Sequence, residues 1–202
     1  MDAQTTARPQ VAVLGGINGA GKTTASQRIL RDAMRIPVFT NADAIARGLN
    51  AFDPESEAFR AGRVMLDHMR ELVAARRSFA FETTLAARTY ARWLGELRRG
   101  GYDVHLFYYW LDSPDLSIRR VAERVRAGGH FVPDDTIRRR YSRSVGNFLN
   151  LYRPVVTTWQ VYDNSNGGSR LIAFNNSFFD TILDPDRWEL FNRSADDDGT
   201  DD

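Results

Sequence analysis

The sequence predicts a three-layer α/β fold with a mostly parallel central sheet. Short segments rich in β-branched and aromatic residues alternate along the chain with longer segments of helical character. This alternation is typical of parallel sheets that carry helices on both faces. The length of 202 residues and a hydrophobic content of 43% fit one domain with a well-formed core.

Strand-like segments occur at six places in the chain. The first contains VAVLG, a β-branched run suited to a buried strand, and a glycine-rich turn follows it directly. The expected strands span Val11–Leu14, Pro37–Thr40, Phe79–Phe81, Asp103–Trp110, Gln160–Tyr162 and Arg170–Phe174.

The helical segments lie between and after these strands and are marked by caps, stops and apolar periodicity. Gly100 and Gly101 favour the end of one helix, and Ser113 followed by Pro114 favours the start of the next. In the segments 114–126 and 135–158, apolar residues recur at helical spacing. The expected helices span Lys22–Met34, Glu55–Arg76, Ala87–Arg99, Pro114–Arg126, Asp135–Thr158 and approximately Phe178–Leu190.

Composition narrows the class of protein further. The chain has no cysteine, its N-terminus lacks the pattern of a signal peptide, and no apolar run reaches the roughly 18 residues of a membrane span. We therefore expect a cytoplasmic protein without a membrane segment. The last seven residues, DDDGTDD, contain five aspartates. Residues 196–202 are thus predicted to be a disordered acidic tail behind a single domain of residues 1–195.

The glycine-rich turn matches the pattern G-x-x-x-x-G-K-[ST] between a predicted strand and a predicted helix. Its lysine is the only one in the chain, since 26 of the 27 basic residues are arginine. In such a turn the backbone N–H groups bind phosphate oxygens, the ammonium reaches the β- and γ-phosphates, and the hydroxyl binds Mg²⁺. The pattern predicts a P-loop NTPase fold that binds a nucleoside triphosphate. The residues expected at the phosphates are Gly16, Asn18, Gly19, Ala20, Gly21, Lys22, Thr23 and Thr24.

Two carboxylates directly follow predicted strands, at the sheet edge where parallel sheets bind ligands. Asp43 lies in FTNADAIA, and Glu82 lies in FAFETTLA with Thr83 beside it. A phosphoryl transferase needs one carboxylate to accept a hydroxyl proton and one to hold Mg²⁺. Alternatives stay open: Asp43 as a helix N-cap, and Glu82 as the ion-pair partner of an arginine. Asp112 follows another strand, but a cap or turn role is the better interpretation.

Arginines are concentrated in residues 119–144, where they make up eight of 26 residues. Two predicted helices there are joined by AGGHFVP, which offers glycine hinges. We interpret this segment as a lid whose arginines close on charged phosphates. A solvated basic face and a nucleic-acid surface are the alternatives. The arginines expected to point toward a ligand are Arg120 and Arg124 on the first helix, and Arg139, Arg140 and Arg143 on the second.

Two further polar residues lie in predicted loops. His130, in the turn of the lid, is a candidate proton shuttle, although a hydrogen bond to the backbone is the better interpretation. Asn164 lies in VYDNSNGG after a late strand, where this architecture holds the base of a nucleotide. An ordinary turn would have the same composition.

Five segments, in this order and spacing, resemble short bacterial proteins of the zeta toxin family, which belong with the P-loop kinases: GGINGAGKTT, FTNADAIA, FETTLA, RVAERVRAGGHFVPDDTIRRRYSRS and YDNS. The resemblance covers roughly Val11 to Phe174. It implies ATP and Mg²⁺ as cofactors and phosphorylation of a hydroxyl, on UDP-N-acetylglucosamine in the best-known members. It also implies an antitoxin protein as a partner. The GGHFVP lid marks a branch whose acceptor the resemblance does not settle.

The same resemblance implies roles for individual residues. Lys22 and Thr23 bind the triphosphate and Mg²⁺, Asp43 is similar to the catalytic base, and Glu82 is similar to the carboxylate near the substrate. The lid arginines most similar to the phosphate clamps are Arg124 and Arg140.

We therefore expect a kinase that transfers the γ-phosphoryl group of ATP to a hydroxyl of a small, nucleotide-sugar-like molecule. The alternatives are a polynucleotide 5′-hydroxyl kinase, an ATPase or switch acting on a protein partner, and a binding module without turnover. The residues expected in the chemical step are Asp43, Lys22, Arg124 and Arg140. Those expected at the acceptor are Asp43, Glu82, Thr83, Arg139 and Arg143; those at the metal are Thr23 and Glu82; and those at the nucleoside are Arg120 and Asn164.

Overall fold

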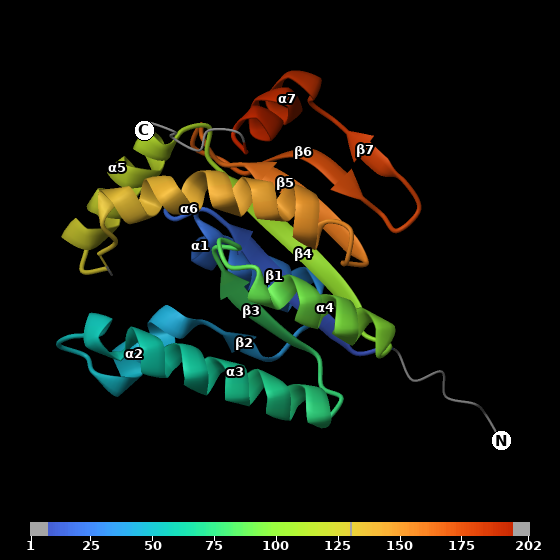
Figure 1. Cartoon of the computed structure of the whole chain (residues 1–202), viewed down its shortest axis with the longest axis horizontal. Helices are drawn as coiled ribbons and strands as arrows, with labels where there is room; N and C mark the ends of the chain where they lie inside the picture. The colour runs from blue at the N-terminus through green and yellow to red at the C-terminus, as the bar shows by residue number, and fades with distance from the viewer. Residues whose placement is uncertain (1–7, 130, 196–202) are drawn as a thin grey trace.

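The computed structural model describes residues 8–129 and 131–195, which form a seven-stranded sheet with helices on both faces (Figure 1). The strand order is β2-β3-β1-β4-β5-β6-β7. Neighbours from β2 to β5 are parallel, whereas β6 and β7 are antiparallel. The predicted α/β fold with a mostly parallel sheet is confirmed. In sheet order the strands are β2 (Phe39–Thr40), β3 (Phe79–Thr83), β1 (Gln10–Gly16), β4 (Asp103–Trp110), β5 (Thr158–Asp163), β6 (Arg170–Asn175) and β7 (Asp180–Ile182).

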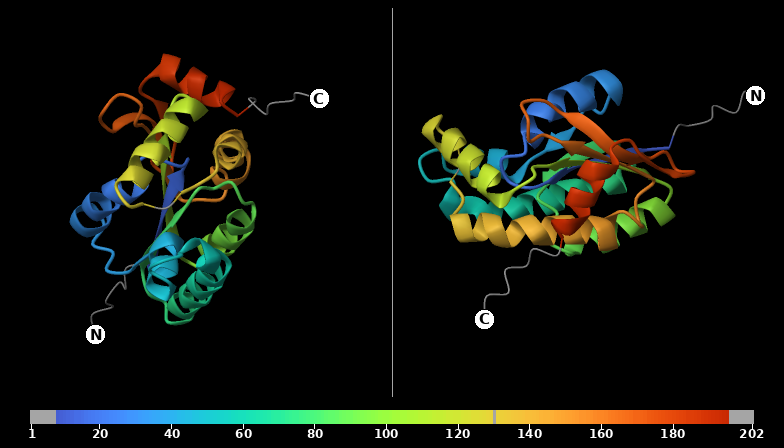
Figure 2. Two further views of the ribbon diagram at one scale, coloured as in Figure 1. Left: turned by 90° about the vertical axis from the view of Figure 1, so that its left-hand side faces the viewer. Right: turned by 90° about the horizontal axis from the view of Figure 1, so that it is seen from above.

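Helix α1 (Lys22–Gln27) lies on one face of the sheet, and α4 (Thr89–Arg99) lies on the other face with α6 (Asp134–Asn147) (Figure 2). Both α1 and α6 continue as π-helical turns, Arg28–Ala33 and Phe148–Tyr152. Because β1 lies between β3 and β4, the loops after these three strands gather at one edge of the sheet. The remaining helices are α2 (Ala42–Leu49), a 3₁₀ turn (Glu55–Glu57), α3 (Ala58–Ala74), α5 (Pro114–Arg126) and α7 (Pro185–Arg193).

The long helix predicted over Asp135–Thr158 ends earlier than expected. Its last π-helical residue is Tyr152, and β5 already begins at Thr158. Pro154 and the β-branched run that follows it explain the difference, because neither continues a helix well.

The helix predicted near Phe178–Leu190 is wrong at its start. Asn176 accepts hydrogen bonds from the backbone N–H groups of Phe178 and Phe179, which makes a turn rather than a helix. The strand β7 follows this turn. The helix α7 begins only after Asp184, whose side chain caps it by accepting from the N–H of Arg187.

Aromatic side chains build the core between the sheet and α6. Phe191 of α7 is fully buried. Its ring lies 5.5 Å from that of Tyr108, and 5.6 Å from those of Trp110 and Phe148. The C-terminal helix is therefore part of the same core as the centre of the sheet.

We expect Phe191→Ala to lower the free energy of unfolding by about 3–5 kcal/mol, because it leaves a cavity among three packed rings. Urea denaturation measures this loss. Leu190→Ala is the matched control, because Leu190 is the preceding residue and is 38% exposed. Equal losses in the two variants would contradict a core role for Phe191.

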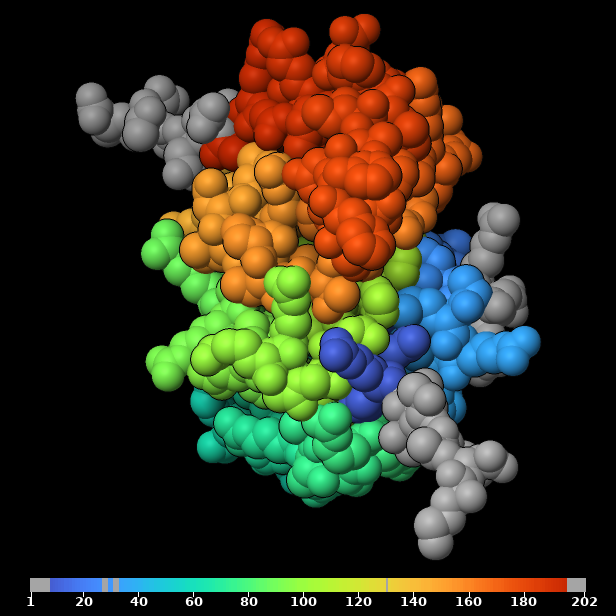
Figure 3. Space-filling view, turned by 90° about the vertical axis from the view of Figure 1, so that its right-hand side faces the viewer, coloured from blue at the N-terminus to red at the C-terminus, as the bar shows by residue number. Residues whose placement is uncertain are grey.

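Figure 3 shows the molecule from the end opposite the gathered loops, with the C-terminal elements at the top and α3 at the bottom. The start of β1 reaches the surface between them. Within the residues described, none of the helices has the length and apolar content needed to span a bilayer.

Candidate active site

The turn between β1 and α1 has a backbone that glycine permits. Gly16, Gly19 and Gly21 have φ angles of +132°, +73° and +81°, a region that other residues rarely adopt. Ser117 of α5 holds the turn from outside, since its hydroxyl donates to the carbonyl of Asn18 at 2.6 Å. This is the strand–turn–helix context that the phosphate-binding pattern requires.

Lys22 is buried at the base of this turn, with a side chain that is 6% exposed. Its Nζ donates to the carbonyls of Gly16 and Ile17 at 2.9 and 2.8 Å, and lies 4.0 Å from Glu82 Oε1. Burial lowers the pKa of Lys22; Glu82 opposes that shift, and Arg124 adds to it. An anion bound beside Lys22 would favour its charged form.

Glu82 lies at the end of β3 and holds two neighbours. Its Oε2 accepts hydrogen bonds from Thr23 Oγ1 at 2.8 Å and from Asn41 Nδ2 at 2.9 Å. The predicted alternative partner was a lid arginine, but the contacts of Glu82 are with the phosphate-binding turn and with Asn41. The sequence places Asn41 at the end of the second expected strand, but its contact with Glu82 was not predicted, because that contact depends on β2 and β3 being neighbours in the sheet.

The side chains of Thr23 and Glu82 fit a Mg²⁺ ion. Hydroxyl and carboxylate oxygens are the donors that Mg²⁺ prefers, and it usually takes one or two protein ligands together with phosphates and water. Among the described residues, no group of three or more His, Cys, Asp or Glu side chains could hold a metal. A Mg²⁺ ion here would therefore share its coordination with a bound triphosphate.

Asp43 lies in the first turn of α2, and it is not the N-cap. The cap is Asn41, whose Oδ1 accepts from the N–H of Ala44 at 3.1 Å. The capping alternative for Asp43 is therefore wrong, and its carboxylate lines the same cavity as Lys22 and Glu82.

The five lid arginines expected to point toward a ligand divide into three groups, the first of which is Arg120 alone, at the larger cavity described below. Arg124 and Arg140 line the cavity that contains Asp43, whereas Arg139 and Arg143 are exposed and line neither cavity described below. Burial lowers the pKa of Arg140, and so does neighbouring Arg139, whereas Asp43 raises it. The two arginines named by the family resemblance are thus the two that the fold brings to Lys22.

The smaller of the two cavities has a volume of about 210 Å³ and separates α2 and α3 from α5 and α6. Thr83 lines it together with Glu82 and Asp43. Asn41 and Thr84, which follow expected strands, also line it, whereas the wall residues not predicted from the sequence are Ala42, Gly62, Met65, Tyr90 and Val132.

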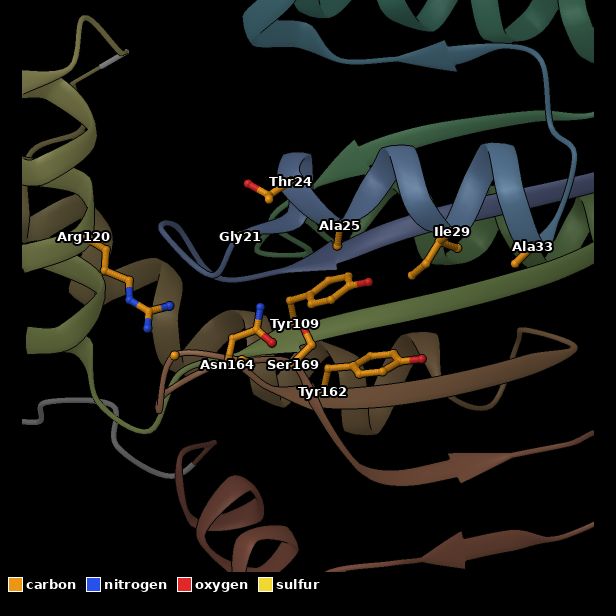
Figure 4. Close-up of a pocket in the computed structure, with 12 residues that line it drawn as sticks. Gly21, Thr24, Ala25, Ile29, Ala33, Tyr109, Arg120, Tyr162, Asn164 and Ser169 are labelled. Carbon is orange, nitrogen blue, oxygen red and sulfur yellow. The ribbon is translucent and has the colours of Figure 1, made fainter.

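The larger cavity, of about 920 Å³, runs along α1 (Figure 4). Arg120 lies at one end, Asn164 in the middle, and Ile29 and Ala33 at the other end. Asn164 Nδ2 donates to the carbonyl of Ala20 at 2.6 Å, which ties the turn after β5 to the phosphate-binding turn.

Tyr109 and Tyr162 form the sheet side of this cavity. They are register partners on β4 and β5, and their rings stack with centroids 5.3 Å apart. These two tyrosines were not predicted as cavity residues from the sequence, because only the register of β4 and β5 shows that they share a face of the sheet.

Asp112 has a structural partner, as the sequence analysis favoured. Its Oδ2 accepts from Arg187 of α7 at 3.1 Å. His130 and the predicted acidic tail, residues 196–202, lie outside the described residues.

The two helices of the predicted lid are anchored at opposite ends. The start of α5 contacts the phosphate-binding turn through Ser117, and the C-terminal half of α6 is held by Ser144 and Asn147, which donate to the carbonyls of Thr84 and Leu85. A separate apolar cluster joins the far part of the two helices: Val121, Val132 and Ile137, with Ile118 and Val125 packed against it. The hydrogen bonds that anchor the two helices therefore lie away from the connection between them.

The turn, the buried lysine and the two adjoining cavities define a P-loop nucleotide-binding protein with the fold of P-loop kinases. A family model described as an AAA domain matches residues 11–145, and the chain belongs to that family. A protein of Haemophilus influenzae described only as uncharacterized is 29% identical over 126 residues, which are 62% of this chain and 88% of that protein.

Solved structures share the fold at low sequence identity. The complex of AvrRxo1-ORF1 and -ORF2 with ATP matches with a TM-score of 0.73 at 13% identity, covering 93% of this chain; the match spans 64% of the length of that protein. The PezAT toxin–antitoxin system of Streptococcus pneumoniae matches with a TM-score of 0.60 at 19% identity, covering 92% and 79% of the two chains. A gluconokinase from Sinorhizobium meliloti matches with a TM-score of 0.50 at 19% identity, covering 79% and 84%.

Proposed function

We propose that this protein is a kinase that transfers the γ-phosphoryl group of ATP to a hydroxyl group of a small acceptor. The observation that carries the proposal is the composition of the smaller cavity. One carboxylate of the α2 helix, Asp43, faces the same space of about 210 Å³ as Lys22, Arg124 and Arg140. A proton acceptor surrounded by cations is what phosphoryl transfer to a hydroxyl requires.

In this proposal the larger cavity holds the nucleoside of ATP and the smaller one holds the acceptor hydroxyl. Asp43 orients that hydroxyl and accepts its proton as the new P–O bond forms; the bond between the γ-phosphorus and the oxygen bridging to the β-phosphate breaks, and ADP leaves. Lys22, Arg124 and Arg140 stabilise the charge on the transferred group, and Glu82 keeps Thr23 in place. A bound Mg²⁺ ion would neutralise charge on the β- and γ-phosphates.

The size of the smaller cavity limits what it encloses. About 210 Å³ accommodates the reacting end of an acceptor, so the rest of a nucleotide sugar would lie outside, between α2–α3 and the connection of α5 to α6. UDP-N-acetylglucosamine is the first acceptor to test, since the sequence resembles the zeta toxins. The AvrRxo1-ORF1:-ORF2 complex and the PezAT toxin–antitoxin system support an antitoxin protein as a partner.

The test is ATP consumption with Mg²⁺ across a panel of acceptors: UDP-N-acetylglucosamine, other nucleotide sugars, nucleosides, dinucleotides and 5′-hydroxyl oligonucleotides. We expect one small-molecule acceptor to be phosphorylated, and Asp43→Asn to slow that reaction by about 10²–10⁴-fold, because the general base is removed. Asp67→Asn is the matched control, since Asp67 is an exposed carboxylate paired with Arg70 on α3.

Three outcomes would contradict the proposal. Phosphorylation of oligonucleotides alone, with a steep dependence on salt, would favour the polynucleotide kinase. Hydrolysis that no acceptor accelerates and that Asp43→Asn leaves unchanged would favour a nucleotide switch. A full rate of acceptor phosphorylation in Asp43→Asn would exclude the proposed base.

A further inference from the structure

The turn after β5 is built around one buried carboxylate. Asp163, the last residue of β5, is 5% exposed. Its Oδ1 accepts from the backbone N–H of Ser165 at 2.9 Å and from the hydroxyl of the same residue at 2.5 Å. The N–H of Asn164 donates to the carbonyl of Trp110 at the end of β4. The conformation of the turn thus depends on Asp163 staying in place.

Arg187 of α7 holds this carboxylate from behind. Its Nε donates to Asp163 Oδ2 at 2.7 Å, and its NH2 group donates to Asp112 Oδ2 at 3.1 Å and to Ser165 Oγ at 3.2 Å. The guanidinium also lies over the ring of Trp110, 5.0 Å from its centroid. Arg187 therefore fixes the ends of β4 and β5 and the turn that follows β5. It does so through charge-assisted hydrogen bonds to two carboxylates.

The front of the same turn faces the larger cavity (Figure 4). The carbonyl of Ala20 can only accept a hydrogen bond, so Asn164 must direct its Nδ2 group there. Its Oδ1 is consequently the free end of the amide; it is buried and has no hydrogen-bond partner among the residues that the structure describes. Arg120 completes this wall, since its NH2 group donates to the carbonyl of Ser165 at 3.2 Å.

Asn164 lines this cavity, and the unpartnered acceptor at the end of its side chain favours a ligand group that donates. Adenine carries an amino group at its 6-position, whereas hypoxanthine and guanine carry an acceptor oxygen there. A base with the oxygen would place two acceptors against each other, and Asn164 Oδ1 would stay without a partner. The turn is therefore suited to distinguish these bases.

We propose that Arg187 is a positioning residue for the nucleotide base: by fixing the Asp163–Ser165 turn from α7, it aims Asn164 Oδ1 at the amino group of an adenine in the larger cavity. This inference rests on the proposed nucleotide site. It gives a role to a residue of α7, which lies on the opposite side of the turn from the ligand.

The test measures binding by calorimetry, with Mg²⁺ and the full chain, for ADP, IDP and inorganic tripolyphosphate. IDP replaces the amino group of ADP by oxygen, and tripolyphosphate has no base. We expect the wild-type protein to bind ADP about tenfold or more tightly than IDP, the range expected for one buried unmatched polar group. In Arg187→Gln and in Asn164→Leu this ratio should fall to about two or less, with the affinity for tripolyphosphate unchanged. Arg187→Lys should restore part of the ADP-to-IDP affinity ratio, because lysine keeps the positive charge but lacks the planar guanidinium that donates to two carboxylates at once.

Arg193→Gln is the matched control, because Arg193 lies on the same helix in an exposed pair with Glu189. An Arg187→Gln protein that keeps the wild-type ratio, or that weakens tripolyphosphate binding equally, would overturn the positioning role. A wild-type ratio near one would overturn the selectivity. Neither result depends on phosphoryl transfer. A protein that shows the selectivity but phosphorylates no acceptor would reject the proposed kinase alone.

Discussion

Replacement of Lys22 by methionine is expected to lower ATP-dependent phosphoryl transfer by about 10²–10³-fold, the usual effect of removing one preorganised cation or donor from a charged transition state. Lys22 is the only lysine in the chain, and its ammonium sits between the carbonyls of Gly16 and Ile17 at the base of the phosphate-binding turn. Initial rates at saturating ATP and acceptor measure the change. We expect most of it in kcat rather than in the KM of the acceptor.

The stability of the same variant separates chemistry from folding. Burial lowers the pKa of Lys22, which means that the fold disfavours its charge when no anion is present. Lys22→Met removes the desolvation cost of a buried charge, but it also leaves two carbonyls and Glu82 without a donor, so we expect it to melt within a few degrees of the wild-type protein. A melting temperature many degrees lower would show that the loss of activity comes from unfolding.

Lys22→Arg tests geometry against charge. Arginine keeps the positive charge, but its planar fork is larger than an ammonium and does not fit between two carbonyls at 2.9 and 2.8 Å. We expect this variant to be nearly as slow as Lys22→Met. Wild-type rates in Lys22→Arg would mean that charge alone is required.

The parts of the site that the sequence predicts well are those that depend on local spacing. The glycines, Lys22 and Thr23 of the phosphate-binding turn are contiguous, and the flanking strand and helix have the right composition. Asp43 and Glu82 could be placed at the edge of the sheet because each follows a strand. Which of the lid arginines face Lys22 could not be derived from helical spacing, since Arg120 and Arg124, four residues apart, line different cavities.

The parts that could not be predicted depend on register and on distant contacts. Asn41 caps α2 and also binds Glu82, which requires β2 and β3 to be neighbours although 41 positions separate the two residues. Arg187 meets Asp112 across 75 positions. The final helix was predicted to begin near Phe178, just before the residues that form β7. Its true start after Asp184, which places Arg187 in the first turn, was therefore not predicted.

The anchoring of α5 and α6 links these features to the proposed reaction. Ser117 near the start of α5 and Ser144 in α6 donate to carbonyls of the core, so the backbone of Arg140, one turn before the buried Ser144, is anchored without a ligand. Arg124 lies near the other end of α5, close to the connection. A bound triphosphate would therefore meet Arg140 on an anchored part of α6. It would meet Arg124 near the separate apolar cluster that joins the two helices.

Gly16→Ala is expected to remove nucleotide binding and to destabilise the fold together. A Cβ atom at position 16 would lie 2.1 Å from the carbonyl oxygen of Tyr109, which is backbone of the neighbouring strand β4. The φ angle of +132° is in addition strained for any side chain. Strain of about 1–3 kcal/mol and overpacking of about 1–3 kcal/mol together predict a loss of about 2–6 kcal/mol of unfolding free energy.

The two effects have one cause, because the turn and the central strand pair share this residue. Moving the turn to make room would shift the N–H groups away from the phosphates, and keeping it would strain the pairing of β1 with β4, in which Gly16 lies opposite Tyr109. Thermal melting and ADP calorimetry measure the two losses. Gly48→Ala is the matched control: it lies in α2 with no atom within 4 Å of the added Cβ, so it should be neutral or stabilising by up to about 1 kcal/mol. A Gly16→Ala protein that melts and binds ADP like the wild-type would show that the turn can shift at no cost, and the preformed phosphate site would then have to be abandoned.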